Sequence, residues 1–583
     1  MNTNRRGFLT GAAYAGVAAA VAGCRGFRLP GGSSASLIDF AVPPMKRIRV
    51  GVVGVGSRGE GAVHRLAMIP GVEVTGLCDW SAKKIEDQRA WFAKRNLRFP
   101  TAYTGSPDCH RRLCDAPDVD VVYNATGWPS HVPVAMAALE SGKHVLIEVP
   151  AAPRIEDCWR LVETAEKYRL HCMQLENDCY ERGKLIAAQL AHDGTLGEIT
   201  HADGSYIHYL TDYNHLREDD ALWRLWWDRD HSGDPYPTHG LMPIFKMMDI
   251  NCGDRLTHLV SMGSQPAAYA EYGREHYPVG DPHRVAFRMP DVATTLIQTA
   301  KGRSITITHD VSTPRPGEVR SAVMGTKGYY SWDPTQIVLA DPKHQPCKHY
   351  KSMKEDEIKA FNEKHMHQLW RVAGDIAKKV GGHGGLDFIM DLRWVYCLQN
   401  GLPLDQSVYD LAASCSVCEL SERSCLNGSA PQEIPDFTRG AWRTAKPRLV
   451  GEIDPKRMGL DVNAVSRDNA QLNVCSRFAI LAENKNPNGG LNEQKRDGAC
   501  RGGGCGVCRG RNDVGRLDQY GLQGGGYGGC QPVGLARELD GRERRPDRGR
   551  ADERCRPLRR HADARPAVGH GPQAPLHGKV EGR

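Results

Sequence analysis

The first segment able to do chemistry is a glycine-rich turn, GVGSRG, at residues 54–59. It follows a β-branched strand pattern at 47–53 and precedes a helical pattern with Ala62, Leu66 and Ile69 on one side. Glycines in a G-x-G-x-x-G turn let the backbone approach a pyrophosphate, and the following helix N-terminus offers N–H groups to it. The segment therefore predicts dinucleotide binding.

An acidic residue stands where a ribose would need it. The strand pattern at 72–78 ends in Asp79, twenty residues after Gly59. A carboxylate at that place accepts hydrogen bonds from ribose hydroxyls and repels a 2′-phosphate. The sequence thus favours NAD over NADP, and a solvated strand end is the alternative for Asp79.

Two later strand patterns, residues 119–126 and 144–147, lead into Trp128 and His131 and into Glu148, respectively. Ligands of an open parallel sheet lie beyond the carboxyl ends of its strands. We therefore expect these three side chains beside the nicotinamide. A helix-capping role is the alternative for His131.

An arginine among aromatic residues lies further along, in the segment WRLWW at 223–227. A guanidinium flanked by aromatic rings commonly holds a sugar by stacking and hydrogen bonding. Arg224 is therefore a candidate sugar ligand, and a hydrophobic cluster with a solvated arginine is the alternative.

No metal site is expected. His383 and Asp387 are too few ligands for a closed site, and a glycine-rich turn before a helix explains them better. The nineteen cysteines follow no disulfide framework spacing, and Cys500, Cys505 and Cys508 lack a suitably spaced fourth ligand.

The surrounding patterns predict two folded parts. Strands and helices alternate over residues 47–150, which predicts an α/β Rossmann domain with a doubly wound parallel sheet. Residues 151–445 combine strand-like alternation, as at 304–308, with helical stretches at 356–379 and 386–400. This second part is expected to be an α+β domain with a largely antiparallel open sheet.

The N-terminal residues 1–24 have the pattern of a twin-arginine export signal, with Arg5 and Arg6 before a small, apolar run. That run is too short and too rich in Ala and Gly for a good membrane span. It ends in VAGC, which resembles a lipobox, so lipidation of Cys24 and simple cleavage nearby are alternatives. We expect a periplasmic protein or a membrane-anchored lipoprotein, with residues 25–46 as a linker.

Residues 446–583 form an extension whose hydrophobic periodicity disappears after about residue 463. Such a segment cannot bury enough apolar surface to offset its ordering entropy, so disorder is expected from about residue 464. A low-complexity tail and a product of a shifted reading frame are the two alternatives. The net charge of +7 is concentrated there, and because basic tails are usually solvated, no nucleic-acid partner is expected.

With the glycine turn and Asp79, the H-x-x-x-A-x-x-A-L-x-x-G-K-H-V stretch at 131–145 resembles the Gfo/Idh/MocA oxidoreductases. Dehydrogenases of that superfamily carry Glu-Lys-Pro at the next strand end, and the lysine helps at the nicotinamide. This chain has Glu148, Val149 and Pro150 instead. The missing lysine argues against plain alcohol dehydrogenase chemistry.

The segments EVP at 148–150, ENDCY at 176–180, YPTHGL at 236–241 and HGGLDFIM at 383–390 together resemble glycoside hydrolase family 109. The resemblance covers about residues 45–445. It implies an NAD-dependent glycosidase, as typified by α-N-acetylgalactosaminidase. It also implies a reaction in which the sugar is oxidised at C3, loses its C1 substituent by elimination, adds water and is reduced again.

The resemblance further implies a set of ligand contacts. The expected NAD-binding residues are Gly54, Gly56, Ser57, Arg58, Gly59, Asp79, Trp128, Pro129, Ser130, His131, Glu148, Val149 and Asn177. The expected sugar-binding residues are Tyr206, Arg224, Tyr236, Pro237, Thr238 and His239. The family places a tyrosine after an Arg-Pro pair where this chain has Gly317, which leaves the identity of the sugar open.

Such a reaction needs proton carriers near C2 and C3, and histidine suits this because its ordinary pKa is near 6.5. We expect His239 to be an acid/base residue, with Tyr180 as its catalytic partner. Sugar binding alone is the alternative for His239, and a structural hydroxyl under the nicotinamide is the alternative for Tyr180. An NAD-dependent sugar oxidoreductase and a non-catalytic sugar-binding protein are the other functional hypotheses. Pairing of open sheet faces into a homo-oligomer is a further expectation.

Overall fold

The structure is a computed structural model that describes residues 36–211, 222–340 and 349–459. The export signal with Cys24, the first part of the expected linker and the tail from residue 464 lie outside these residues.

A six-stranded parallel sheet forms the N-terminal part, in the order β3-β2-β1-β4-β5-β6. Its strands are β1 (Ile48–Val53), β2 (Val72–Cys78), β3 (Thr101–Tyr103), β4 (Val121–Asn124), β5 (His144–Ile147) and β6 (Cys172–Gln174). The doubly wound parallel sheet is confirmed. Because β6 belongs to it, the sheet continues past residue 150, the boundary that the sequence patterns suggested.

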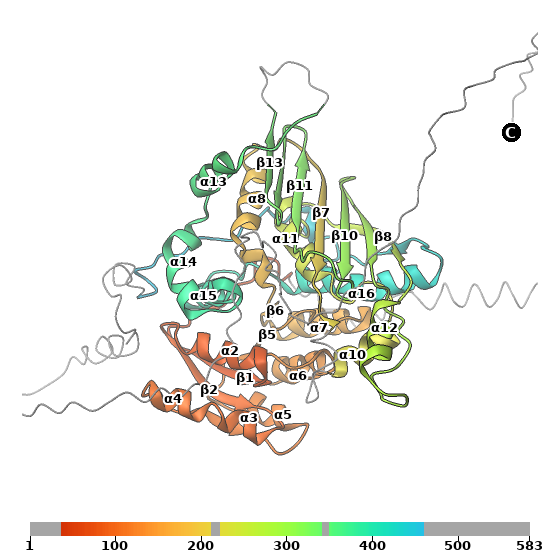
Figure 1. The fold of residues 1–583 in the computed structure, drawn as a ribbon. Helices are drawn as coiled ribbons and strands as arrows, with labels where there is room; N and C mark the ends of the chain where they lie inside the picture. The colour runs from red at the N-terminus through yellow and green to blue at the C-terminus, as the bar shows by residue number, and fades with distance from the viewer. Residues whose placement is uncertain (1–35, 212–221, 341–348, 460–583) are drawn as a thin grey trace, which may run out of the picture. The chain divides into compact units, whose positions relative to one another are not determined.

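Helices cover both faces of this sheet (Figure 1). One face carries α2 (Ser57–Leu66) and, from far along the chain, α15 (Leu386–Asn400). The other carries α5 (Cys109–Cys114), α6 (Trp128–Glu140) and α7 (Ile155–Tyr168). The short helices α3 (Ala82–Glu86) and α4 (Arg89–Lys94) connect β2 to β3.

The second sheet has eight strands in the order β13-β12-β11-β7-β10-β9-β8-β14. Its strands are β7 (Ile199–Ile207), β8 (Leu256–Gly263), β9 (Ala293–Thr299), β10 (Ser304–Asp310), β11 (Ser321–Gly325), β12 (Gly328–Trp332), β13 (Gln336–Leu339) and β14 (Gln432–Glu433). Only β7 and β10 pair in parallel, so the largely antiparallel sheet is confirmed.

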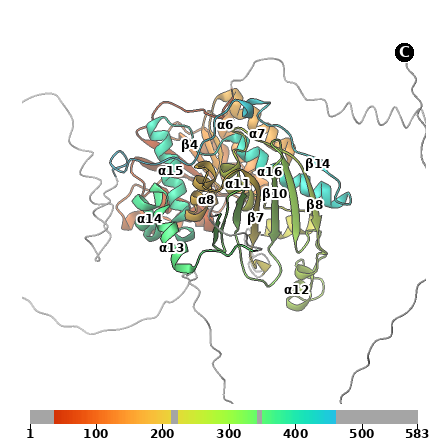
Figure 2. The same ribbon diagram turned by 90° about the horizontal axis from the view of Figure 1, so that it is seen from above.

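Three helices, α8 (Arg182–His192), α11 (Thr238–Met248) and α16 (Val408–Leu426), pack against one face of this sheet (Figure 2). The strands alternate accordingly: Thr295 and Ile297 of β9 are buried, whereas Leu296 between them is 51% exposed. The remaining helices are α10 (Leu222–Asp230), α12 (Ala268–His276), α13 (Glu355–Lys364), α14 (Gln368–Val380) and the 3₁₀ turns η1 (Asn177–Tyr180), η2 (His383–Gly385) and η3 (Ala441–Arg443).

Residues 36–46 belong to the folded core rather than to a linker. Leu37 and Ile38 are buried, and the backbone N–H of Met45 donates to the carbonyl of Leu398. The physical cause is that two adjacent apolar side chains, Leu37 and Ile38, leave water by packing into the hydrophobic core.

Within the described ranges, all eleven cysteines are free thiols. No helix there is long and apolar enough to cross a membrane.

Candidate functional site

The glycine turn at the end of β1 has two different kinds of space around it. A Cβ built on Gly59 would lie 1.7 Å from the carbonyl oxygen of Gly54, so only glycine fits there. A Cβ built on Gly56 would meet nothing within 4 Å. The turn is therefore tight between loop and helix, but open above Gly56, where α2 begins at Ser57.

Asp79, buried at the carboxyl end of β2, holds this turn. One carboxylate oxygen accepts a hydrogen bond from the backbone N–H of Val55 at 2.9 Å, and the other accepts from the N–H of Ser81 at 2.9 Å. Each oxygen can accept a further hydrogen bond, so the carboxylate remains able to bind ribose hydroxyls.

Arg58 links the glycine turn to two distant carboxylates. Its guanidinium donates to Glu148 at 2.9 Å and to Asp387 of α15 at 3.0 Å. The ring of His383 lies beside the same arginine and carboxylate, 3.2 Å and 3.0 Å away. Although burial raises the pKa of Asp387, Arg58, His383 and Arg65 together hold it well below the usual value. The sequence places His383 and Asp387 in a family motif and predicts a turn there, but it does not predict their contact with Arg58.

Asn177 adds an unused acceptor next to this ion pair. Its side-chain Nδ2 donates to Asp387 at 2.6 Å, whereas its buried Oδ1 has no hydrogen-bond partner among the described residues. A buried acceptor without a partner costs free energy, so this atom is suited to receive a donor from a ligand.

Trp128 and His131 begin the helix that follows β4. The indole N–H of Trp128 donates to the carbonyl of Val149 at 3.1 Å. The two ring nitrogens of His131 each lie 2.9 Å from a main-chain carbonyl, those of Pro150 and Thr126. The side chain of His131 therefore joins two loops instead of pointing at a ligand. Pro129 and Ser130 are exposed in the first turn of the same helix.

The predicted sugar-binding residues come together in an aromatic cluster, made of Trp128, Tyr206, Trp223, Tyr236 and His239. The rings of Tyr206 and Tyr236 stack with centroids 4.5 Å apart, and His239 lies 5.1 Å and 5.0 Å from them. Trp128 lies 5.8 Å from Tyr236 and 4.9 Å from Trp223.

Arg224 of α10 supplies the positive charge of this cluster. Its guanidinium carbon lies 5.1 Å from the Trp128 ring, 5.4 Å from the Trp223 ring and 5.5 Å from the Tyr236 ring. Burial raises the pKa of Tyr206 even though Arg224 lowers it. The hydroxyl of Tyr206 therefore keeps its proton at neutral pH and can donate a hydrogen bond.

His239 lies in the first turn of α11 and is held by two carboxylates. Its Nδ1 is 2.5 Å from Glu176 and 3.3 Å from Asp178. Burial lowers the pKa of His239, but the two carboxylates outweigh burial and raise it above the usual value. Preceding it, Pro237 caps the helix, and Thr238 is buried with an unpartnered Oγ1.

The comparisons with known proteins identify the family of this chain. Residues 48–175 match the family model described as "Oxidoreductase family, NAD-binding Rossmann fold", and residues 180–444 match "Glycosyl hydrolase 109, C-terminal domain". Glycosyl hydrolase family 109 protein 1 of Bacteroides fragilis strain YCH46 is 42% identical over 424 residues, which are 70% of this chain and 89% of that protein. The chain belongs to glycosyl hydrolase family 109.

Two further relatives are informative. A family 109 member named alpha-N-acetylgalactosaminidase, from Bacteroides fragilis strain ATCC 25285, is 40% identical over 416 residues, which are 70% of this chain and 96% of that protein. A levoglucosan dehydrogenase solved with NADH and levoglucosan shares the fold, with a TM-score of 0.50, 17% identity and coverage of 67% of this chain and all of that one.

The carboxylates that hold His239 were missed by sequence reasoning. Glu176, Asp178 and His239 offer ligand atoms within 4.8 Å of one another, as a metal site would. However, the ammonium of Lys184 already pairs with Asp178 at 2.8 Å, so a cation is present among these acids. The signal for Glu176 was available, because it follows β6 at the carboxyl edge of the parallel sheet.

Tyr180 does not join the aromatic cluster of this family 109 chain. It is fully buried, its hydroxyl lies 3.4 Å from Asp405, and its carbonyl accepts from the indole of Trp370. Among the described residues, no hydrogen bond links it to His239. At the turn η1, Glu176 and Asp178 face His239 whereas Tyr180 is buried in the core, so the prediction that Tyr180 is the catalytic partner of His239 is wrong.

Gly317, which stands where the family has a tyrosine, lies beside the end of β7. It is exposed, and a Cβ built on it would approach only the carbonyl oxygen of Ile207, at 3.4 Å. Ile207 follows Tyr206 of the aromatic cluster. A side chain could therefore stand at position 317 without disturbing the backbone.

Proposed function

We propose that this protein is a glycosidase that keeps NAD bound and uses it to cleave a glycoside by oxidation, elimination, addition of water and reduction. The observation that carries the proposal is that the aromatic cluster lies beside the residues expected to bind NAD. Trp128 belongs to the aromatic cluster and, through its bond to Val149, to the strand end beside Glu148 and Arg58. A sugar on the aromatic cluster would therefore lie next to a nicotinamide.

The residues of the N-terminal part fit NAD. The open space over Gly56 at the start of α2 suits a pyrophosphate, and Asp79 has acceptor capacity left for ribose hydroxyls. The unpartnered Oδ1 of Asn177 suits an amide donor. When bound, NAD would take a hydride from the sugar and return it, so that no external oxidant is consumed.

This chain's own residues would position the sugar and move protons. The guanidinium of Arg224 and the hydroxyls of Tyr206 and Tyr236 would hold sugar hydroxyl or acyl oxygens, with the rings covering an apolar sugar face. Because Nδ1 of His239 faces Glu176, its Nε2 is the nitrogen available to take and return a proton. The raised pKa of His239 keeps a substantial protonated fraction near neutral pH, which suits a group that must act as both acid and base.

For the substrate, we propose an α-N-acetylgalactosaminide. The support is the relative of that name, which this chain matches over 96% of its length. Gly317 removes a phenol from the neighbourhood of Tyr206, so the affinity for this sugar is expected to be lower than in relatives that keep the tyrosine.

The test is a panel of aryl glycosides, in which release of the aryl alcohol and absorbance of NADH are followed together. Aryl alcohol without net NADH supports the proposal. Accumulating NADH with free sugars indicates a sugar oxidoreductase instead, and neither signal across the panel indicates a sugar-binding protein.

The control uses two histidines that each face a carboxylate. His239→Ala should lower kcat by at least about 100-fold, the usual contribution of an acid/base group. His192 pairs with Asp249 at 3.1 Å on α8, so His192→Ala should leave kcat unchanged. Undiminished turnover in His239→Ala rejects the acid/base role.

We further propose export by the twin-arginine route, with lipid attached at Cys24. The support is the sequence of residues 1–24 together with a cofactor that is regenerated in each cycle and need not be replaced outside the cytoplasm. Replacing Arg5 and Arg6 by lysine should retain the protein in the cytoplasm, and Cys24→Ala should release it from membranes.

We also propose a homo-oligomer formed by the open sheet face, where Met262 and Leu296 are 67% and 51% exposed. Analytical sedimentation tests it, because Leu296→Glu should then lower the sedimenting mass.

A further inference from the structure

Four charged groups meet beneath the aromatic cluster, and we call them the buried charge group: Glu176, Asp178, Lys184 and His239. His239 contacts both carboxylates through Nδ1, and Lys184 contacts Asp178 at 2.8 Å. The side chains of Glu176 and Lys184 are 0% and 1% exposed. Solvent therefore screens these interactions little.

Glu176 is held in place by hydrogen bonds from Asp178 and Gln406. Its Oε1 also accepts from the backbone N–H of Asp178 at 3.1 Å, and its carbonyl accepts from Gln406 at 2.9 Å. The second oxygen, Oε2, is buried and without a partner among the described residues. The carboxylate is thus held in one place, and it faces Nδ1 of the imidazole, which must carry a proton to donate to it.

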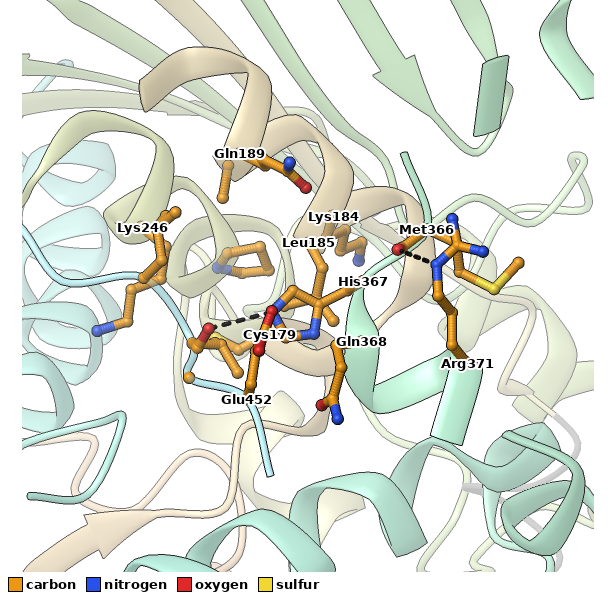
Figure 3. A pocket seen from close by; sticks show the side chains of 15 residues that line it. Cys179, Lys184, Leu185, Gln189, Lys246, Met366, His367, Gln368, Arg371 and Glu452 are labelled. Atoms are coloured by element: carbon orange, nitrogen blue, oxygen red, sulfur yellow. Dashed lines mark hydrogen bonds between the residues drawn. The ribbon is translucent and has the colours of Figure 1, made fainter. Parts of the chain in front are cut away.

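Lys184 reaches this group from the other side. It belongs to α8 and lines a cavity of about 600 Å³ between α8, α11, α14 and residues 449–452. Figure 3 shows Lys184 on the wall that α8 forms, near Leu185 and Met366, whereas Lys246 comes from α11 at the left of the view. The ammonium lies on the Asp178 side of that wall, so it neutralises one of the two carboxylates that His239 faces.

Other titratable and charged groups lie near His239. They are Tyr206 of β7, His208 directly after β7, His309 of β10, Arg224 of α10, His383 of η2, and Tyr236 just before α11. None of them has a hydrogen bond to His239 in the described part of the chain. The two carboxylates and Lys184 therefore dominate its electrostatic surroundings.

We propose that Glu176 is a positioning residue that keeps the proton on Nδ1 of His239 and presents Nε2 to the sugar, while the Asp178–Lys184 ion pair sets the net negative charge around the imidazole. The acid/base part of this inference rests on the proposed function. Its electrostatic part does not, because it concerns the resting protein.

The two parts of this inference, the role of Glu176 and that of the Asp178–Lys184 ion pair, predict opposite shifts in the pKa of His239. Glu176→Gln removes a negative charge in contact with the imidazole, so the pKa of His239 should fall by about 1 to 3 pH units. Among the described residues, Lys184 supplies the one ammonium in contact with the buried charge group. Lys184→Met removes it, so the pKa of His239 should rise by about 1 pH unit or more. A purely structural role for either side chain predicts no such opposition.

The measurement is hydrogen–deuterium exchange at the imidazole C2 position, followed by mass spectrometry of the peptide that contains His239, on the full chain without substrate. The pH dependence of this exchange reports the pKa of that one histidine. The pH profile of kcat is recorded in parallel and should move in the same direction for each variant.

Removing Lys184 leaves the buried carboxylate of Asp178 with only His239 as a cationic partner in the described part of the chain, and this loss can prevent folding. The double variant Asp178→Asn/Lys184→Met removes both charges of the ion pair, and the pKa of His239 should return to within about half a unit of the original value, since a lone carboxylate, Glu176, remains. Glu176→Asp keeps the negative charge, so it should reverse most of the fall in the His239 pKa that Glu176→Gln produces. Lys246→Met is the matched control, because Lys246 lines the same cavity without contacting the buried charge group.

The inference is supported if the pKa of His239 shifts in opposite directions in Glu176→Gln and Lys184→Met, returns near its original value in the double variant, and stays unchanged in Lys246→Met. An unchanged His239 pKa in Glu176→Gln, or shifts of the same sign in Glu176→Gln and Lys184→Met, overturns it. If Lys184→Met does not fold, a double variant whose pKa departs by more than about one unit overturns the inference just as directly. Shifts in exchange without any glycosidase activity would reject the proposed function alone.

Discussion

Asp79→Asn tests how the dinucleotide is held. The carboxylate accepts two backbone hydrogen bonds, from Val55 at 2.9 Å and from Ser81 at 2.9 Å, through different oxygens. Asparagine has one side-chain oxygen, so one of these N–H groups would face an amide N–H₂ instead. The substitution therefore loosens the glycine turn and removes the negative charge that would accept from the ribose.

The expected effect on NAD follows from one charge-assisted hydrogen bond. Such a bond contributes about 1.5 to 3 kcal/mol, and each 1.4 kcal/mol is a tenfold change in Kd. Affinity for NAD should thus fall about 10- to 100-fold. Affinity for NADP should fall less, because the repulsion of its 2′-phosphate is removed at the same time. Both affinities are measured by titrating cofactor-free protein and following tryptophan fluorescence.

Asp120→Asn is the matched control. Asp120 also accepts a backbone N–H, that of Arg49 at 3.0 Å, but it precedes β4 and lies at the amino end of the sheet. It should lower thermal stability without changing cofactor affinity. The reasoning is refuted if Asp79→Asn weakens NAD binding no more than Asp120→Asn does, or if NADP affinity falls in equal measure.

Two further predictions follow from the site, and a third concerns Asp234, a buried carboxylate two residues before Tyr236. Gly59→Ala should lower the thermal midpoint, since its Cβ would lie 1.7 Å from a carbonyl oxygen, whereas Gly56→Ala should keep the midpoint and lose only NAD affinity. Gly317→Tyr should lower KM for an N-acetylgalactosaminide several-fold at unchanged stability, because position 317 has room; a lower thermal midpoint would contradict this. Burial raises the pKa of Asp234 to about 7 from an unfolded value near 3.9. Its contribution to stability is therefore complete below about pH 4 and declines as pH rises through 7, so Asp234→Asn should flatten the pH dependence of urea unfolding between pH 5 and 8.

Local patterns predicted the dinucleotide half of the site well. The strand expected at 72–78 is β2, and the one expected at 144–147 is β5. The physical reason is that a glycine turn, a strand end and a helix start are neighbours in the chain, so their spacing records their geometry. The strand β6 was missed because three residues, Cys172–Gln174, are too short to show a period.

Side-chain partners were much harder to predict. The position of His131 suggested a ligand contact, but whether its ring nitrogens face a ligand or two carbonyls depends on loops that pack together only in the fold. Tyr180 was mispredicted for the same reason. Its neighbours in sequence face the site, yet the turn places its hydroxyl near Asp405, 225 residues away in the chain. A residue type and its spacing identify a region, and packing decides the direction of each side chain.

The ion pairs of α2 show that the cofactor half of the site is not an independent module. Arg65 of α2 is 4% exposed and donates to Asp391 of α15 at 2.8 Å, and Arg58 in the first turn of α2 pairs with Asp387 of the same helix. Removing the Asp391 carboxylate alone would take away the nearest partner of this buried charge, at a cost of about 3 to 5 kcal/mol. That is a large part of the roughly 5 to 15 kcal/mol by which a domain is stable. The glycine turn near the N-terminus is therefore held in its binding form by a helix more than three hundred residues later in the chain, which also contributes the carboxylate beside Asn177.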